Sequence, residues 1–238
     1  MSNGAKPSIE AGSTASIVPA ASAKTQIVNR EGTSAMQLHL FRHGQTNWNE
    51  ERRVQGQSES QLTELGIHQA QELSKRIQHL QFDQVYCSSS VRTRQTADHA
   101  FADFEAQIEF LDCLREINLG PWEGHLYDDI AVRDPDSFKH FWEQPHLFDV
   151  EGAETFYQLQ ERAIGAVRKM LKQFVRRKVA IVSHGALIKS LLCHFQQRPM
   201  SELWAPPKMH NCAHSIVELN ADGIGHIILY ADQTAPGE

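Results

Sequence analysis

Two histidine residues, each followed by glycine, stand at the ends of two apolar runs. The first lies in Leu40-Phe41-Arg42-His43-Gly44-Gln45-Thr46, and the second follows Val179-Ala180-Ile181-Val182 in Ser183-His184-Gly185. Both runs are typical of buried strands, and in an open α/β sheet ligands bind at the carboxyl ends of the strands. The repeated ending therefore predicts that His43 and His184 belong to one site.

Side chains of these types could transfer a phosphoryl group. Such a site needs a nucleophile, fixed positive charges around the phosphate oxygens and an acid for the leaving oxygen. A neutral histidine can be the nucleophile near pH 7, and the guanidinium groups of Arg42 and Arg92 can each bind two phosphate oxygens. Gly44 would let a ligand approach the backbone closely. Taken alone, Arg92 and Glu116 would be ordinary solvated charges, so the prediction depends on all of them occurring together.

Other kinds of site fit the sequence less well. The glycine-rich nucleotide loops GxxxxGK[ST] and GxGxxG are absent from the sequence. The spacing from Cys87 to Arg92 is one residue shorter than in cysteine phosphatases, so we expect Cys87 to be the buried end of a strand. His43, His184 and Glu116 could hold zinc if they met, but two adjacent arginines would repel a cation. We therefore expect neither a metal nor a cofactor.

The composition describes a globular protein that acts on a small molecule. The chain has 238 residues, of which 41% are hydrophobic, and it contains no apolar run long enough to span a membrane. A net charge of −6 gives no general attraction to nucleic acid or anionic lipid, so a local basic cluster must do any anion binding. Four cysteines without a CxxC pair are typical of reduced thiols, which predicts a cytoplasmic location.

Strand and helix patterns alternate from residue 36 onward. They predict an α/β fold, a three-layer sandwich in which helices flank a mainly parallel central sheet. Asn220-Ala221-Asp222-Gly223 joins two strand-like runs, which predicts a C-terminal β-hairpin at the sheet edge. Thr63 is the expected N-cap of the first long helix. The expected strands are 37–41, 84–88, 108–111, 179–183, 213–219 and 224–230, and the expected helices are 63–79, 91–102, 155–176 and 186–195.

Two segments differ from this regular pattern. Residues 1–35 are rich in small and polar side chains, and we expect a disordered low-complexity N-terminal tail before a single domain at 36–238. Residues 120–153 are irregular and aromatic, with Trp122 and Trp142 among them. Long connections of this kind are often lids or binding loops, and a small subdomain with a core of its own is the alternative.

The order of these residues resembles the histidine phosphatase superfamily, also called the phosphoglycerate mutase-like family, from about Gln37 to about Tyr230. Residues 42–46 are similar to the motif RHG[EQ]T, and residues 182–185 are similar to V[ST]HG. So many matches in one order argue against coincidence. Further segments that resemble the family are Trp48-Asn49, Arg53-Val54-Gln55-Gly56, Leu62-Thr63-Glu64-Leu65-Gly66, Ser89-Ser90-Val91-Arg92-Thr93-Arg94-Gln95-Thr96-Ala97, Leu114-Arg115-Glu116-Ile117 and Gly120-Pro121-Trp122-Glu123-Gly124.

The resemblance implies a role for each matched position. His43 is the expected phosphorylated nucleophile and Glu116 the expected proton donor, while His184 is expected to donate a hydrogen bond to the phosphate. A carbonyl should hold one ring nitrogen of His43 as a donor, and cationic neighbours should lower its proton affinity. Gln45 and Thr93 depart from the commoner Glu and Ala without removing a catalytic group. The expected catalytic residues are His43, Glu116, Arg42, Arg92 and His184, and the expected substrate-binding residues are Asn49, Gln55, Gly44, Thr46 and Trp142.

The resemblance implies a metal-independent phosphatase that hydrolyses small-molecule phosphate esters through a phosphohistidine intermediate. The interval between Glu116 and His184 lacks the long insertion of the founding mutases, and residues 140–148 and 203–207 look like those of bacterial broad-specificity phosphatases. An aromatic lid with Trp142 would favour apolar or aromatic leaving groups. A phosphoglycerate mutase-type transfer is the alternative, and a non-catalytic phospho-ligand binder is a second one.

Overall fold

The structure, a computed structural model, describes residues 36–105, 107–174 and 177–234. All of them belong to one compact unit, Gly32–Glu238. The predicted tail at 1–35 lies outside the described residues. Within them, no helix is both long and apolar enough to cross a membrane.

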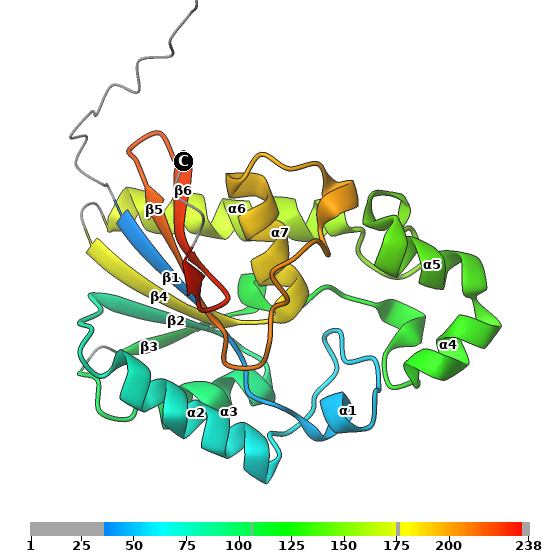
Figure 1. The fold of residues 1–238 in the computed structure, drawn as a ribbon, viewed down its shortest axis with the longest axis horizontal. Coiled ribbons are helices and arrows are strands. Elements are labelled where there is room, and N and C mark those ends of the chain that lie inside the picture. The colour runs from blue at the N-terminus through cyan, green and yellow to red at the C-terminus, as the bar shows by residue number, and fades with distance from the viewer. Residues whose placement is uncertain (1–35, 106, 175–176, 235–238) are drawn as a thin grey trace, which may run out of the picture. The chain divides into compact units, whose positions relative to one another are not determined.

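The described residues form a seven-stranded mixed sheet in the order β3-β2-β4-β1-β5-β6-β7 (Figure 1). The first four strands in that order are mutually parallel, and the last three are antiparallel to their neighbours. The mainly parallel sheet with a C-terminal hairpin is therefore confirmed, with the short β7 as an addition. The strands are β1 Met36–Arg42, β2 Gln84–Ser88, β3 Ile108–Leu111, β4 Arg177–Ser183, β5 His214–Leu219, β6 Gly225–Tyr230 and β7 Gln233–Thr234.

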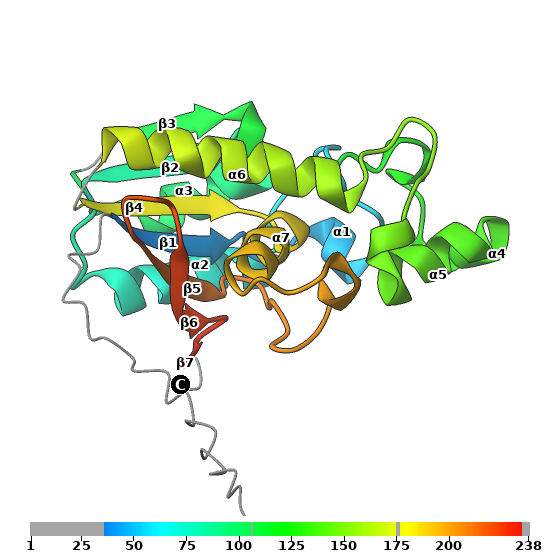
Figure 2. The same cartoon turned by 90° about the horizontal axis from the view of Figure 1, so that it is seen from above.

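Helices cover both faces of the sheet (Figure 2). Residues alternate along β1, so that Leu38 and Leu40 pack with α6 and α7 while Phe41 packs with α2 and α3. The predicted three-layer sandwich is confirmed. The Thr63 side chain accepts from the Gly66 N–H, as its predicted role of N-cap requires. These helices are α2 Glu64–Ile77, α3 Val91–Ala100, α6 Phe156–Gln173 and α7 Gly185–Phe195.

The aromatic segment 120–153 contains two short helices that the sequence pattern did not predict, α4 Tyr127–Arg133 and α5 Pro135–Glu143. Asn118 and Glu154, which flank this segment, are hydrogen-bonded to each other, and we call this pair the neck of the segment. There the Asn118 N–H donates to the Glu154 carboxylate at 2.8 Å, and the Glu154 N–H donates to the Asn118 carbonyl at 2.7 Å. Phe141 and Phe148 pack against Phe156 of α6, so the buried residues of the segment belong to the same hydrophobic cluster as the sheet.

The register of the central strands brings the two predicted motifs together. Arg42 at the end of β1 lies beside Ser183 at the end of β4, and the His43 N–H donates to the Ser183 carbonyl at 3.0 Å. On its other side β4 pairs with β2, which ends at Ser88. Because these strands are parallel, their carboxyl ends form one edge of the sheet, and the residues that follow them meet there.

Candidate active site

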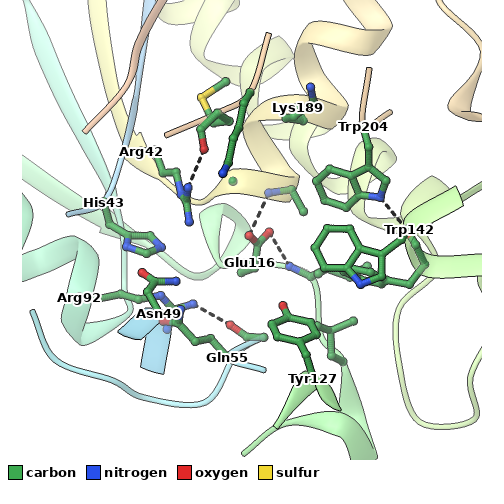
Figure 3. A pocket seen from close by; sticks show the side chains of 18 of the residues that line it. Arg42, His43, Asn49, Gln55, Arg92, Glu116, Tyr127, Trp142, Lys189 and Trp204 are labelled. Atoms are coloured by element: carbon green, nitrogen blue, oxygen red, sulfur yellow. Dashed lines mark hydrogen bonds between the residues drawn. The ribbon is translucent and has the colours of Figure 1, made fainter. Parts of the chain in front are cut away.

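A cavity of about 610 Å³ opens at this edge of the sheet. Arg42, His43, Arg92, Asn49 and Gln55 lie at one end of it. Tyr127, Trp142 and Trp204 lie at the other end, and Glu116 lies between them (Figure 3). Seven of the ten predicted site residues line the cavity, and His184, Gly44 and Thr46 do not. The seven are Arg42, His43, Asn49, Gln55, Arg92, Glu116 and Trp142.

The His43 ring has one occupied nitrogen and one open nitrogen. Its Nδ1–H donates to the Gly44 carbonyl at 2.7 Å, and no described residue hydrogen-bonds its Nε2. Burial above all, and then the charges of Arg92 and Arg42, hold the pKa of His43 well below its usual range. The imidazole is therefore neutral at pH 7, and its Nε2 lone pair is available on the cavity side.

Arg92 lies in the first turn of α3 and is almost completely buried. Its Nη1 and Nη2 donate to the carbonyls of Ser58 and Gly56 at 2.8 and 2.7 Å, and its Nε donates to His184 Nδ1 at 3.2 Å. Burial lowers the pKa of Arg92 to about 10, so the guanidinium remains charged at neutral pH. Three fixed contacts thus hold a permanent cation at the base of the cavity.

His184 makes hydrogen bonds to protein groups in this structure, and its expected hydrogen bond to the phosphate stays a prediction. Its Nδ1 accepts from Arg92, which leaves Nε2–H to donate to Ser88 Oγ at 2.8 Å. Both nitrogens are thus occupied by protein groups, so in this arrangement His184 has no N–H to offer a phosphate. The His184 ring lies 5.3 Å from the His43 ring, measured between centroids, and it positions Arg92.

Arg42 approaches the cavity from the end of β1. Its Nη1 donates to the Met209 carbonyl at 2.6 Å, while its buried Nε has no hydrogen-bond partner among the described residues. A Cβ at Gly185 would lie 3.4 Å from that Nε, so the guanidinium packs closely against the start of α7.

Two amides complete the polar end of the cavity. The Asn49 Oδ1 accepts from the Thr46 N–H at 3.1 Å, and the Gln55 Oε1 accepts from the hydroxyls of Thr46 and Ser60 at 3.0 and 2.7 Å. These bonds fix the amide orientations and leave both NH₂ groups as donors for a ligand. Buried Thr46 thus positions Asn49 and Gln55 and does not itself line the cavity.

Gly44 serves packing between protein segments. A Cβ at this position would lie only 2.5 Å from the Gly66 carbonyl in α2, so no larger residue fits. The sequence analysis expected the missing side chain to admit a ligand. The structure shows that it admits the first turn of α2, which fixes the loop after His43.

The Glu116 carboxylate is the acidic side chain that lines the cavity. Its oxygens accept from the backbone N–H groups of Ala186 and Leu187, each at 3.0 Å, at the start of α7. The Glu116 carbonyl accepts from Gln57 Nε2 at 3.1 Å and from Arg162 Nη2 at 3.2 Å. Both the side chain and the backbone of this residue are therefore held in place, and the carboxylate lies between the His43 end and the aromatic end of the cavity (Figure 3).

Sequence reasoning did not assign several cavity residues, among them Tyr127, Lys189 and Lys208. Burial raises the pKa of Tyr127 to about 12, so its hydroxyl keeps its proton at neutral pH. The buried Lys189 donates to the carbonyls of Ala205 and Pro207, and burial lowers its pKa to about 8. Tyr127, Lys189 and Lys208 lie far apart in the sequence and outside the segments that resemble the family. Other unassigned lining residues do stand in such segments, namely Gly56, Ile117, Phe141, Gly185, Trp204 and Pro206.

The rejected site types can also be examined. Within residues 36–234, apart from the gaps, no group of three His, Cys, Asp or Glu side chains is arranged to hold a metal ion. Cys87 is the buried end of β2, as predicted, and burial raises the pKa of its thiol to about 12. A thiol with this pKa is not a thiolate nucleophile at neutral pH.

Comparisons with known proteins show which family this chain is similar to. A family model described as "Histidine phosphatase superfamily (branch 1)" matches residues 38–232. Phosphoserine phosphatase 1 of Hydrogenobacter thermophilus is 26% identical over 184 residues, which cover 77% of this chain and 87% of that protein. "Probable phosphoglycerate mutase GpmB" of Salmonella choleraesuis is 29% identical over 185 residues, with coverages of 77% and 85%. The solved structure of Bacillus stearothermophilus YhfR is 38% identical, covers 84% of this chain and 98% of its own, and superposes with a TM-score of 0.81.

Proposed function

We propose, from the premise that this chain belongs to the histidine phosphatase superfamily, that it hydrolyses small-molecule phosphate monoesters without a metal, through a phosphohistidine on His43. The phosphatases among its relatives place it with the phosphoric monoester hydrolases. The observation that carries the proposal is the state of His43, which is neutral, held through Nδ1 and open at Nε2 beside two arginines. The neighbouring His39 is also buried but has both nitrogens occupied.

The first step transfers the phosphoryl group to the enzyme. His43 Nε2 attacks phosphorus while the bond from phosphorus to the ester oxygen breaks, and the electron pair of that bond goes to the oxygen. Glu116, carrying a proton, gives it to the leaving oxygen so that a neutral alcohol departs. Arg42, Arg92 and the free amide NH₂ groups of Asn49 and Gln55 stabilise the charge on the phosphate oxygens.

The second step returns the enzyme to its starting state. Glu116, now a carboxylate, takes a proton from a water molecule whose oxygen attacks the phosphohistidine. The bond between nitrogen and phosphorus breaks, its electron pair returns to His43 Nε2, and inorganic phosphate leaves. Glu116 is protonated again, so one carboxyl serves as acid and then as base.

The aromatic end of the cavity favours apolar or aromatic alcohols. Trp142 and Trp204 lie 5.3 Å apart between ring centroids, and Trp142 lies 5.6 Å from Tyr127, so flat apolar faces meet the leaving group. Replacing Trp142 by Ala should lower kcat/KM for aryl phosphates about tenfold more than for glycerol phosphate. Equal losses on both substrates would show that this wall does not select apolar groups.

The test is phosphate release together with trapping of the intermediate. Wild-type enzyme treated exhaustively with a chelator should release phosphate from phenyl phosphate at the full rate. When the phosphoryl group of the substrate is labelled, an acid-labile, base-stable phosphoryl label should accumulate on His43. His43→Ala should abolish both signals. Strict dependence on added zinc or magnesium would overturn the proposal.

The same assay separates the two alternatives. A phosphoglycerate mutase, the function in the name of the Salmonella relative, would hydrolyse phosphate esters slowly. Its activity would depend strongly on a bisphosphate primer. A non-catalytic binder would saturate with a phosphate ester and release none. Either result would replace the hydrolase assignment.

A further inference from the structure

A second hollow of about 400 Å³ adjoins the active-site cavity. We call it the side groove. It shares five lining residues with the cavity, so the two spaces lie next to each other. The shared residues are Asn49, Gln55, Tyr127, Trp142 and Lys208.

The lining of the side groove is basic, although the chain as a whole is acidic. Arg52, Arg53 and Lys208 line it, and no carboxylate does. Arg52 is paired with Asp128 at 3.2 Å and Arg53 with Glu51 at 2.7 Å, so their charges are already matched. Lys208 is exposed and makes no hydrogen bond or ion pair with any residue that the structure describes.

The position of Lys208 relates it to both ends of a substrate. Its neighbour Met209 accepts a hydrogen bond from Arg42, so the backbone beside Lys208 is joined to the phosphate end of the cavity. Its side chain lines the wall that Tyr127 and Trp142 also form. An alcohol that extends from the phosphate along these aromatic rings therefore runs toward the part of the lining that includes Lys208.

We propose that Lys208 and the side groove bind a second anionic group, a carboxylate or a phosphonate, on the alcohol portion of the substrate. This inference rests on the proposed function and narrows its substrate class to monoesters with an apolar body and a distal negative charge. An unpaired ammonium attracts such a group electrostatically, and the rings contact the body between the two anions.

The test compares matched aryl phosphates on the whole enzyme. Wild type should show a higher kcat/KM for 4-carboxyphenyl phosphate than for phenyl phosphate, and Lys208→Met should reduce this ratio about fivefold to tenfold. Lys139→Met is the control, because Lys139 is an exposed lysine of α5 that lines neither space, and it should keep the wild-type ratio. Comparing kcat/KM for 4-phosphonophenyl phosphate and 4-carboxyphenyl phosphate shows whether the groove prefers a phosphonate or a carboxylate.

Each outcome has one meaning. If Lys208→Met lowers kcat/KM equally for all three substrates, Lys208 acts on the reacting phosphate, and the inference is overturned. An unchanged ratio in that variant also overturns it, while the proposed function stands. If wild type hydrolyses none of the three esters, the proposed function itself fails.

Discussion

Two pairs of histidines lie close together in this molecule, and they have different tasks. His43 and His184 form the pair at the carboxyl edge of the sheet. His39 in β1 and His214 in β5 form the second pair, within the layer between the sheet and α2. Burial lowers the pKa of all four imidazoles.

The second pair is held by a hydrogen bond between its two rings and by one to a glutamine. His39 Nε2–H donates to the Gln37 side-chain oxygen at 3.0 Å, and His39 Nδ1 accepts from His214 Nε2 at 2.9 Å. The His214 ring stacks on Phe41 with the centroids 4.4 Å apart. No arginine donates to either ring among the described contacts, and neither ring lines the cavity.

The difference shows what makes a buried histidine chemically available. Depressed proton affinity is common to both pairs, so it does not identify the nucleophile. His43 differs because a carbonyl occupies Nδ1, Nε2 meets a cavity, and two guanidinium groups surround the place where charge must be stabilised. Four predictions test this distinction, in order of decreasing effect.

Replacing the open ring should have the largest effect on activity. His43→Ala should lower kcat at least about 10³-fold, because no other described imidazole presents a free nitrogen to the cavity. His39→Gln should leave kcat within about twofold of wild type. Steady-state phosphate release on both variants provides the measurement, and substantial activity in His43→Ala would identify another nucleophile.

The second pair should instead govern stability in acid. His39 has a folded-state pKa of about 4 against an ordinary value of 6.5, so the unfolded chain binds more protons between these pH values. Stability should therefore fall as the pH drops from 6.5 to 4, by about 3 kcal/mol for this group. His39→Gln should reduce the fall, measured by urea unfolding at pH 7 and pH 4.5.

A matched control is available for that experiment. His68 is an exposed residue of α2, and its replacement by Gln should leave the pH dependence of stability as in wild type. Equal slopes for all three proteins would mean that the His39 and His214 pair does not control acid unfolding.

A smaller effect is expected at the positioning histidine. His184→Asn should raise KM about tenfold to thirtyfold and lower kcat much less, because it loosens one of the three contacts that hold Arg92 and leaves the nucleophile and the proton donor in place. Steady-state kinetics should therefore show a large change in KM with a much smaller change in kcat. If kcat fell as far as in His43→Ala, His184 would have to act directly on the phosphate.

The smallest effect on activity is expected at Ser88, the hydrogen-bond partner of His184. Ser88 accepts from His184 Nε2, so Ser88→Ala removes one hydrogen bond from the ring that holds Arg92. We expect kcat/KM to fall about threefold, and Ser88→Thr should recover most of the loss. A loss beyond tenfold would give the hydroxyl a more direct part in catalysis.

The sequence could predict much of the architecture because the signals were local. Apolar alternation located the strands within a residue or two, and Thr63 gave the start of α2. His43 and Glu116 were found from their motifs. Local patterns could not predict α4 and α5, because their apolar residues serve an aromatic cluster formed with α6 and Trp204.

The sequence could place the motif residues but could not reveal which side chains and backbone groups they contact. His184 and Gly44 lie where the motifs put them, but the residues that they contact, Ser88 and Gly66, come from other segments. Lys208 has no sequence signal, because an exposed lysine is ordinary until a cavity is seen beside it. The pairing of His39 with His214 depends on the β1–β5 register, which the alternation of apolar residues does not reveal.

Arg162 of α6 has a consequence for how the molecule opens. Its guanidinium donates to the carbonyls of Cys113, Arg115 and Glu116, and it also pairs with Glu154 at the neck of the aromatic segment. The backbone that carries the acid is thereby tied to the longest described helix and not to the tip of that segment. In hydrogen exchange, residues 113–116 should therefore open together with α6 as one cooperative unit, while α4 and α5 exchange sooner.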